Sequence, residues 1–142
     1  MAPLTELLAT LTAGLFAGAA VYITFVEHPA RVSCGPGVAV TEFRPSYQRA
    51  AVMQAALAVV GTLAALARWG AVGGIGWLIG GLVFGAVIPF TLFVIFPTNK
   101  RLLDLDLTSS EVGPLLDRWG TLHAVRSAAS LAAFVLFLLL RR

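Results

Sequence analysis

Four long apolar segments, separated by shorter polar stretches, dominate the pattern of hydrophobic and polar positions along the chain. They cover about Leu4–Val26, Ala51–Ala67, Gly73–Phe96 and Leu122–Leu140. A helix that crosses a bilayer needs about 20 mostly apolar residues, and about 17 are tolerated. All four segments are long enough, so the pattern predicts four transmembrane helices.

The short connections between these segments predict how the helices are arranged. Sequential helices joined by short loops form an up-down bundle, so we expect an all-α integral membrane protein with four antiparallel helices. Residues 1–142 would form a single transmembrane domain, with both termini at one membrane face.

The connections carry three further expectations. Between Glu27 and Ala50, prolines and glycines are expected to prevent a continuous helix. The sequence RWGAV would join the second and third spans as a tight hairpin. In the third connection, about residues 97–121, the sequence TSSEVGPLLDRWG would form a short interfacial helix capped by Ser109 or Ser110.

Proline and glycine inside the spans predict local geometry and packing. Pro89 is expected to kink the third helix within one turn, because proline removes a backbone hydrogen bond. In lipid, where no hydrophobic force joins helices, small residues allow the close approach that holds them together. Three GxxxG pairs therefore predict packing within the chain, with a homodimer as the alternative: Gly14/Gly18, Gly76/Gly80 and Gly81/Gly85.

Composition supports a membrane protein and argues against other classes. The chain is 58% hydrophobic and 12% charged, whereas soluble domains carry about 25% charged residues. Its net charge of +3 comes from Lys and Arg near helix ends, where membrane proteins keep them, so we expect no nucleic-acid partner. A cleaved signal peptide is not expected, because no basic residue precedes Arg31. The single cysteine, Cys34, excludes an internal disulfide.

Most polar side chains near the spans gather at one end of the predicted bundle. In an antiparallel arrangement, the end of the first span, the start of the second, the end of the third and the start of the fourth share one membrane face. The positive-inside rule places this face in the cytoplasm and both termini outside. The candidate site residues at this face are Glu27, His28, Arg31, Tyr47, Thr91, Asn99, Trp119, His123 and Arg126.

His123 and Arg126 are the strongest candidates, and interfacial anchoring is the alternative. Interfacial Arg, His and Trp often anchor helices, which explains Arg118 without a functional role. His123 and Arg126 are three residues apart and therefore share one helix face. An arginine at the centre of a membrane helix costs roughly 2.5–3.5 kcal/mol. We therefore expect both side chains near the start of the fourth helix, facing the bundle interior.

A metal site is a minor alternative. His28, His123 and Glu27 would make the set of two histidines and one carboxylate that non-haem iron uses. The sequence has no local HxxxH or CxxC motif, and Arg126 would repel a cation beside His123. We expect neither a metal nor another cofactor.

Four stretches of the sequence resemble the anthrone oxygenase-like family of small four-helix membrane proteins, most of which are bacterial. These stretches are GLFAGAAVYITFVEHPAR, PSYQRAAVMQ, PFTLFVIFPTNKRLL and LLDRWGTLHAVRS. They follow in the same order through nearly the whole chain. The positions that match the family are His28, Pro29, Asn99, Trp119, His123 and Arg126. The resemblance implies a multi-pass protein of a bacterial inner membrane.

The characterised fungal members of that family oxidise anthrones to anthraquinones without a metal or organic cofactor. The resemblance thus implies an oxygenase that takes an apolar aromatic, anthrone- or quinol-like substrate and O₂ from the bilayer. His28 or His123 would be the base, and Arg126 would stabilise the substrate anion. Asn99 would orient the substrate. The remaining candidates would line the binding site: Glu27, Arg31, Tyr47, Thr91 and Trp119.

A non-catalytic membrane protein is the second hypothesis. The same polar end would then hold a lipid headgroup or a partner subunit, with arginines on the lipid phosphate.

Overall fold

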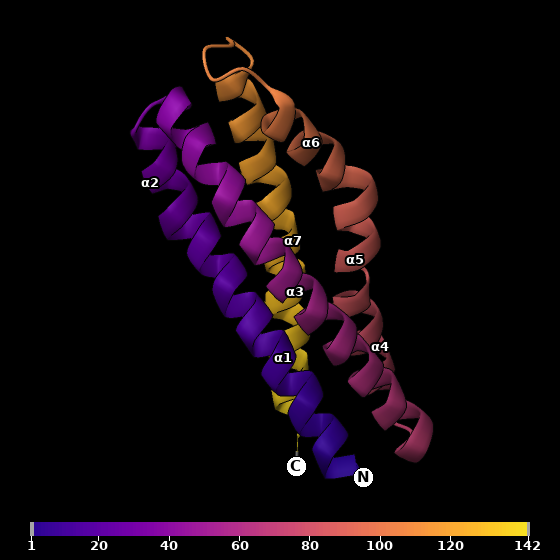
Figure 1. Cartoon of the computed structure of the whole chain (residues 1–142). Coiled ribbons are helices and arrows are strands. Elements are labelled where there is room, and N and C mark those ends of the chain that lie inside the picture. Colours follow the sequence, from indigo (N-terminus) through magenta and orange to yellow (C-terminus); the bar gives the residue numbers. More distant parts are fainter. Residues whose placement is uncertain (1, 142) are drawn as a thin grey trace.

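The chain folds into four long helical rods that run antiparallel, as Figure 1 shows for the computed structural model. The structure describes residues 2–141. The first rod contains α1 (Ala2–Tyr22), the π-helical segment η1 (Ile23–Glu27) and α2 (His28–Ser33). The second rod is α3 (Pro36–Val72), and the fourth is α7 (Val112–Leu140).

The third rod consists of several consecutive segments. They are α4 (Ile75–Gly85), α5 (Val87–Phe90), the π-helical η2 (Thr91–Ile95) and α6 (Phe96–Asp104). The regular α-helix is interrupted at Ala86, three residues before Pro89. Thr91 Oγ1 donates to the Val87 carbonyl at 2.7 Å and so satisfies one backbone acceptor near the proline. A bend of the helix axis at Pro89 stays a prediction.

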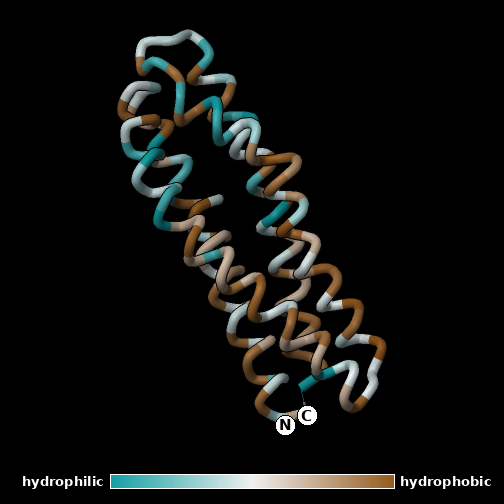
Figure 2. The backbone as a smooth tube through the Cα atoms, turned by 45° about the vertical axis from the view of Figure 1, so that its right-hand side comes forward, coloured by the Kyte–Doolittle hydropathy of each residue, from teal (hydrophilic) through white to brown (hydrophobic). Residues whose placement is uncertain are grey.

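The predicted all-α integral membrane bundle is confirmed. All four rods are long and apolar enough to cross a membrane. Both termini lie at the same end of the bundle (Figure 1). Figure 2 shows that hydrophilic residues concentrate at the opposite end, around the connections from α2 to α3 and from α6 to α7. The assignment of that end to the cytoplasm stays a prediction.

The helices are longer than the predicted spans, and one of the expectations about the first two connections is wrong. As expected, no continuous helix covers residues 27–50, because the chain breaks between α2 and α3. The parts on either side of this break are helical. Pro36 is compatible with helix because it lies in the first turn of α3, where no backbone N–H is needed, and Pro29 follows the π-helical η1. Pro45, in contrast, lies inside α3. The segment RWGAV ends α3, and the turn falls on Gly73 and Gly74, whose φ angles of 78° and 92° favour glycine.

The separate interfacial helix expected in the third connection is also wrong. α7 begins at Val112 and runs without a break through the fourth span, for 29 residues. No side chain caps its first turn; Ser109 Oγ accepts the Glu111 N–H at 3.3 Å instead. His123 and Arg126 therefore lie in the middle of α7 and not in its first turns, so they need partners inside the bundle.

An apolar core fills the half of the bundle nearer the termini. The rings of Phe16 and Phe84 meet edge to face at 5.4 Å between centroids. Trp77 stacks on Phe137 at 5.3 Å. Arg68 closes this end by its ion pair with Glu6. The core thus holds α1, α3, α4 and α7 together below the polar end.

Glycines allow the close approach of these helices. A Cβ atom on Gly14 would lie 2.8 Å from the Phe134 ring, and one on Gly80 would overlap the Phe137 ring. Glycines of the predicted pairs therefore pack against helices of the same chain. Gly18 differs, because its Cβ position has no neighbouring atom within 4 Å. A homodimer through this open position stays a prediction.

Gly80→Ala should destabilise the protein by about 1–3 kcal/mol, because the added methyl group overpacks a filled site against Phe137. Gly18→Ala is the matched control, since its methyl group would meet no atom of the chain. The measurement is thermal unfolding of both variants in detergent. Equal midpoints for the two variants would contradict the packing described here.

Candidate functional site

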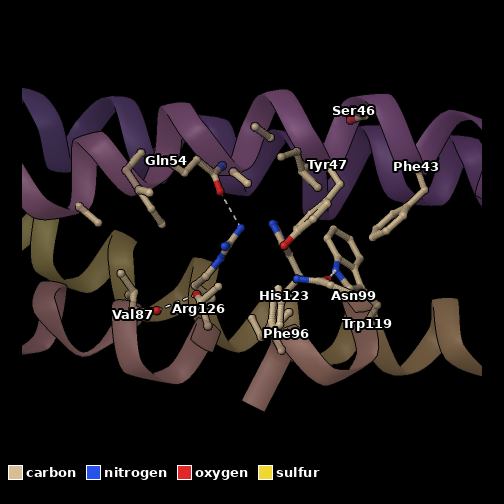
Figure 3. A pocket seen from close by; sticks show the side chains of 18 of the residues that line it. Phe43, Ser46, Tyr47, Gln54, Val87, Phe96, Asn99, Trp119, His123 and Arg126 are labelled. Atoms are coloured by element: carbon tan, nitrogen blue, oxygen red, sulfur yellow. Dashed lines mark hydrogen bonds between the residues drawn. The ribbon is translucent and has the colours of Figure 1, made fainter. Parts of the chain in front are cut away.

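A cavity of about 230 Å³ lies among the helices, between the apolar core and the polar end. α1, η1 and α2 contribute to its wall, as do α3, the third rod and α7. Figure 3 shows this cavity with Gln54 and Tyr47 on one side and Asn99, His123 and Arg126 facing them. Eight of the nine predicted site residues line it: Glu27, Arg31, Tyr47, Thr91, Asn99, Trp119, His123 and Arg126.

His123 is held by two hydroxyl groups at one edge of its ring. Its Nδ1 lies 3.0 Å from Thr24 Oγ1 and 3.3 Å from Ser127 Oγ. Both hydroxyls have backbone acceptors, since each contacts the Ala20 carbonyl, at 2.9 and 3.1 Å. This pattern favours the tautomer in which Nδ1–H donates to a hydroxyl oxygen and Nε2 carries a free lone pair.

The opposite edge of the His123 ring is free. Nε2 is buried and has no hydrogen-bond partner among the described residues. A buried polar atom without a partner costs free energy, so the position is suited to a bound molecule. The ring face stacks on Trp119 at 4.6 Å between centroids, which fixes its orientation.

Arg126 carries the unneutralised charge of the cavity. Its guanidinium donates to Gln54 Oε1 at 2.7 Å and lies 5.5 Å from the centroid of the Phe16 ring. Among residues 2–141, no carboxylate forms an ion pair with it. Its Nε is buried without a partner. A neutral amide and an aromatic face hold the cation in place but leave its charge available to an anion.

Arg126 also lies well below the polar surface of the bundle. It follows the exposed Arg118 by eight residues on α7, which corresponds to about 12 Å along the helix. Charged side chains at such depth in membrane helices usually serve a function. Simple anchoring to headgroups does not describe this position, because the guanidinium points into the cavity (Figure 3).

Asn99 and Trp119 form a fixed pair beside His123. Trp119 Nε1 donates to Asn99 Oδ1 at 2.6 Å, and both side chains are buried. The Asn99 Nδ2 group is left without a partner. Tyr47 extends from α3 toward His123 on the other side of the cavity (Figure 3). Among the cavity-lining side chains that the structure describes, the buried polar atoms without a partner thus include an acceptor, His123 Nε2, and donors of Gln54, Asn99 and Arg126.

An ion-pair network closes the polar end above the cavity. Arg31 is 6% exposed and pairs with Glu27, and its Nε lies 2.7 Å from Glu42 Oε2. Ser46 Oγ donates to Glu27 Oε1 at 2.7 Å. The Arg31 guanidinium also lies over the rings of Phe43 and Trp119, at 5.5 and 5.8 Å. In contrast to Arg126, the charge of Arg31 is balanced.

His28 was expected to share the cavity with His123, and it does not line it. Its ring packs against Trp119 at 5.1 Å and lies over Gly120, where a Cβ atom would come within 2.6 Å of Nε2. Trp119 thus has one imidazole on the cavity side and a second outside. A role for His28 as base stays a prediction that this position does not favour.

Three residues of the site were not singled out from sequence. Gln54 gave a signal, because it is a polar residue inside the second apolar segment and close to the predicted site face. Ser127 gave another, because it lies one turn after His123 on the same helix face. Thr24 gave no signal, because a threonine in an apolar helix usually bonds its own backbone. The hydrogen bonds of Thr24, Gln54 and Ser127 in the folded bundle show that all three belong to the site.

The metal alternative lacks its ligand set. Among the described residues, no group of three His, Cys, Asp or Glu side chains could share a metal ion. Function without any cofactor stays a prediction.

Comparison with known proteins assigns the chain to a family. The sequence model of the anthrone oxygenase family matches residues 43–136, about two-thirds of the chain. This match includes Tyr47, Asn99, Trp119, His123 and Arg126 from the cavity wall. No curated protein and no solved structure is significantly similar to the chain. The chain belongs to the anthrone oxygenase family.

Proposed function

We propose that this protein is a membrane-embedded, cofactor-independent oxygenase that acts on an apolar aromatic substrate of the anthrone or quinol type. One observation carries the proposal. The free Nε2 of His123 and the unneutralised guanidinium of Arg126 border the same small, largely apolar cavity. A base and a fixed cation are the two groups that formation of a substrate anion requires.

The first step is removal of a proton from the CH₂ carbon of the anthrone. His123 Nε2 accepts this proton, and the hydroxyls of Thr24 and Ser127 hold Nδ1–H on the other side of the ring. The C–H electron pair is delocalised onto the carbonyl oxygen, which becomes a phenolate-like oxyanion. Arg126 stabilises this charge, and its fixed set of donors suits an oxyanion better than a flexible ammonium would.

The second step is oxidation of the anion by O₂. The electron-rich anion transfers one electron to O₂, and the two radicals combine to a peroxide anion at the former CH₂ carbon. This anion takes up the proton held by His123 and becomes a hydroperoxide. Loss of water then gives the second carbonyl group. The balance is one anthrone and one O₂ to one anthraquinone and one water, so the oxidant is O₂ and no external reductant is consumed.

A non-catalytic lipid-binding protein remains the second candidate, because a phosphate would also match the free charge of Arg126. Turnover separates the two functions. Oxygen uptake with an anthrone supports the oxygenase, whereas co-purified phospholipid without oxygen uptake supports the lipid-binding protein.

His123→Ala and Arg126→Ala should each abolish most anthrone oxidation while the protein stays folded. The expected losses are about 10²–10⁴-fold for the base and about 10²–10³-fold for the oxyanion partner. Oxygen uptake and anthraquinone absorbance in detergent measure both. Arg118→Ala, at an exposed position of the same helix, is the control and should keep the wild-type rate. Wild-type turnover in either cavity variant would reject the proposal.

Gln54→Glu should lower turnover strongly without loss of stability. The new carboxylate would replace the amide oxygen that accepts from Arg126, so it would keep the bond but neutralise the cation that the substrate anion needs. If Gln54 has a purely structural role, the variant should keep the wild-type turnover, because the new ion pair would preserve or improve the packing around Arg126. Gln48→Glu, on the exposed side of α3, is the matched control. Oxygen uptake and thermal midpoints of both variants decide between these outcomes.

A further inference from the structure

We propose that the cavity opens sideways into the hydrocarbon layer through a portal between α3 and the η2–α6 segment. Its edges are Ala51 and Ala55 on one side and Leu92 and Phe96 on the other. The ligand that uses this portal is a flat aromatic molecule dissolved in the bilayer, with an oxygen that can accept a hydrogen bond. The class of ligand rests on the proposed function, whereas the route rests only on the exposure and packing of the cavity wall.

The exposure of the cavity wall locates the portal. Of all residues that line the cavity, those with exposed side chains are Ala55, Leu92 and Phe96, the last two being 56% and 46% exposed. Every other lining residue is buried or half-buried. The wall therefore reaches the outer surface where α3 faces η2 and α6.

The packing of the helices agrees with an opening at this place. α3 packs extensively against α1 and α4, but it makes little contact with α5 and α6. Ala51, Ala55 and Ala58 follow each other at helical spacing and so line one face of α3. Three methyl groups in a row fill little of the space opposite Leu92 and Phe96, which leaves room between the helices.

Paired charges and packed rings lie between most of the cavity and the water at the polar end. Above the cavity, Arg31 joins η1, α2 and α3 through its ion pairs with Glu27 and Glu42. Below this network, Phe43 packs edge to face on Trp119 at 5.2 Å. A ligand from the aqueous side would have to break the ion pairs of the buried Arg31 guanidinium and separate packed rings, whereas a ligand from the bilayer meets neither.

The portal lies at hydrocarbon depth. Ala55 is six residues below the exposed Arg49 on α3, about 9 Å along the helix. Leu92 is eight residues below the exposed Lys100, about 12 Å. Both positions belong to helices that can span a membrane. The molecules that reach the portal are therefore those that partition into lipid.

The cavity adds constraints on the ligand. Its volume of 230 Å³ is below the roughly 300–1,000 Å³ of common ligand sites, so a compact ring system fits better than an acyl chain with a headgroup. The inner wall offers the guanidinium of Arg126 to one oxygen of the ligand, opposite the apolar portal. Such a ligand would enter edge first and keep its polar oxygen toward α7.

The test follows quenching of Trp119 fluorescence, which needs no turnover. In a Trp69→Phe, Trp77→Phe background Trp119 is the only tryptophan. The protein is placed in phosphatidylcholine nanodiscs, and 9,10-anthraquinone in the lipid or acrylamide in water serves as quencher. We expect quenching by the quinone and little by acrylamide. Strong acrylamide quenching would overturn the proposal, because it would show an aqueous route.

Variants then locate the route. Ala55→Phe should slow quenching by the quinone about tenfold by blocking the gap, whereas Ala56→Phe, on the neighbouring position outside the cavity wall, should not. Because Ala55→Phe could also fill the cavity, a widening variant is needed: Phe96→Ala should accelerate quenching, and Phe93→Ala, exposed but outside the wall, should not. Equal rates within both pairs would overturn the portal.

The outcome is separable from that of the proposed function. Portal-dependent quenching in a protein without anthrone turnover would reject the oxygenase and keep the portal. Loss of turnover in His123→Ala, together with equal quenching in Ala55→Phe and Ala56→Phe, would keep the oxygenase and reject the portal.

Discussion

A guanidinium in the middle of a membrane helix is the constraint on which the polar half of this bundle depends. Arg126 is halfway along α7, with Gln54 as its hydrogen-bond partner and Phe16 beneath it. A carboxylate at this place would have cancelled the charge. The amide satisfies hydrogen-bond geometry and leaves an attractive field for an anion. The surrounding helices must therefore keep water and unwanted ions away from this charge.

The two halves of the bundle shield the Arg126 charge in different ways. Towards the termini, close-packed glycines and aromatic rings make a rigid apolar core. Towards the connections, the balanced charges of Arg31 and its two carboxylates close the bundle. The cavity lies where the two kinds of packing meet, so that neither fills the space completely. A site of this type combines an apolar chamber with a few fixed polar atoms, as small-molecule sites generally do.

Much of this arrangement follows from sequence, and the remainder depends on contacts between helices. Apolar length alone predicts four spans, and antiparallel order then brings Asn99 and His123 to the same end. The length of α7 was not predictable from hydropathy, because Gly113, Pro114 and the charged pair Asp117 and Arg118 interrupt the apolar pattern of its first three turns. The position of His28 depends on the missing side chain of Gly120, and the role of Gln54 depends on which residue faces it across the bundle. Neither can be read from periodicity within one helix.

The two π-helical turns have a consequence for how such a site can be built into a bundle. η1 and η2 both border the cavity, through Ile23 and Glu27 on one side and Thr91, Leu92 and Ile95 on the other. A π turn accommodates one residue more than an α turn, and one residue rotates the following helical face by about 100°. In the first and third rods, each π turn therefore sets which residues of the polar half face the cavity without changing the packing of the apolar half. A one-residue deletion in either turn would restore a regular α turn and keep both halves of the rod in register, whereas a one-residue deletion in an α segment between the core and the cavity would turn the polar segment away from the cavity.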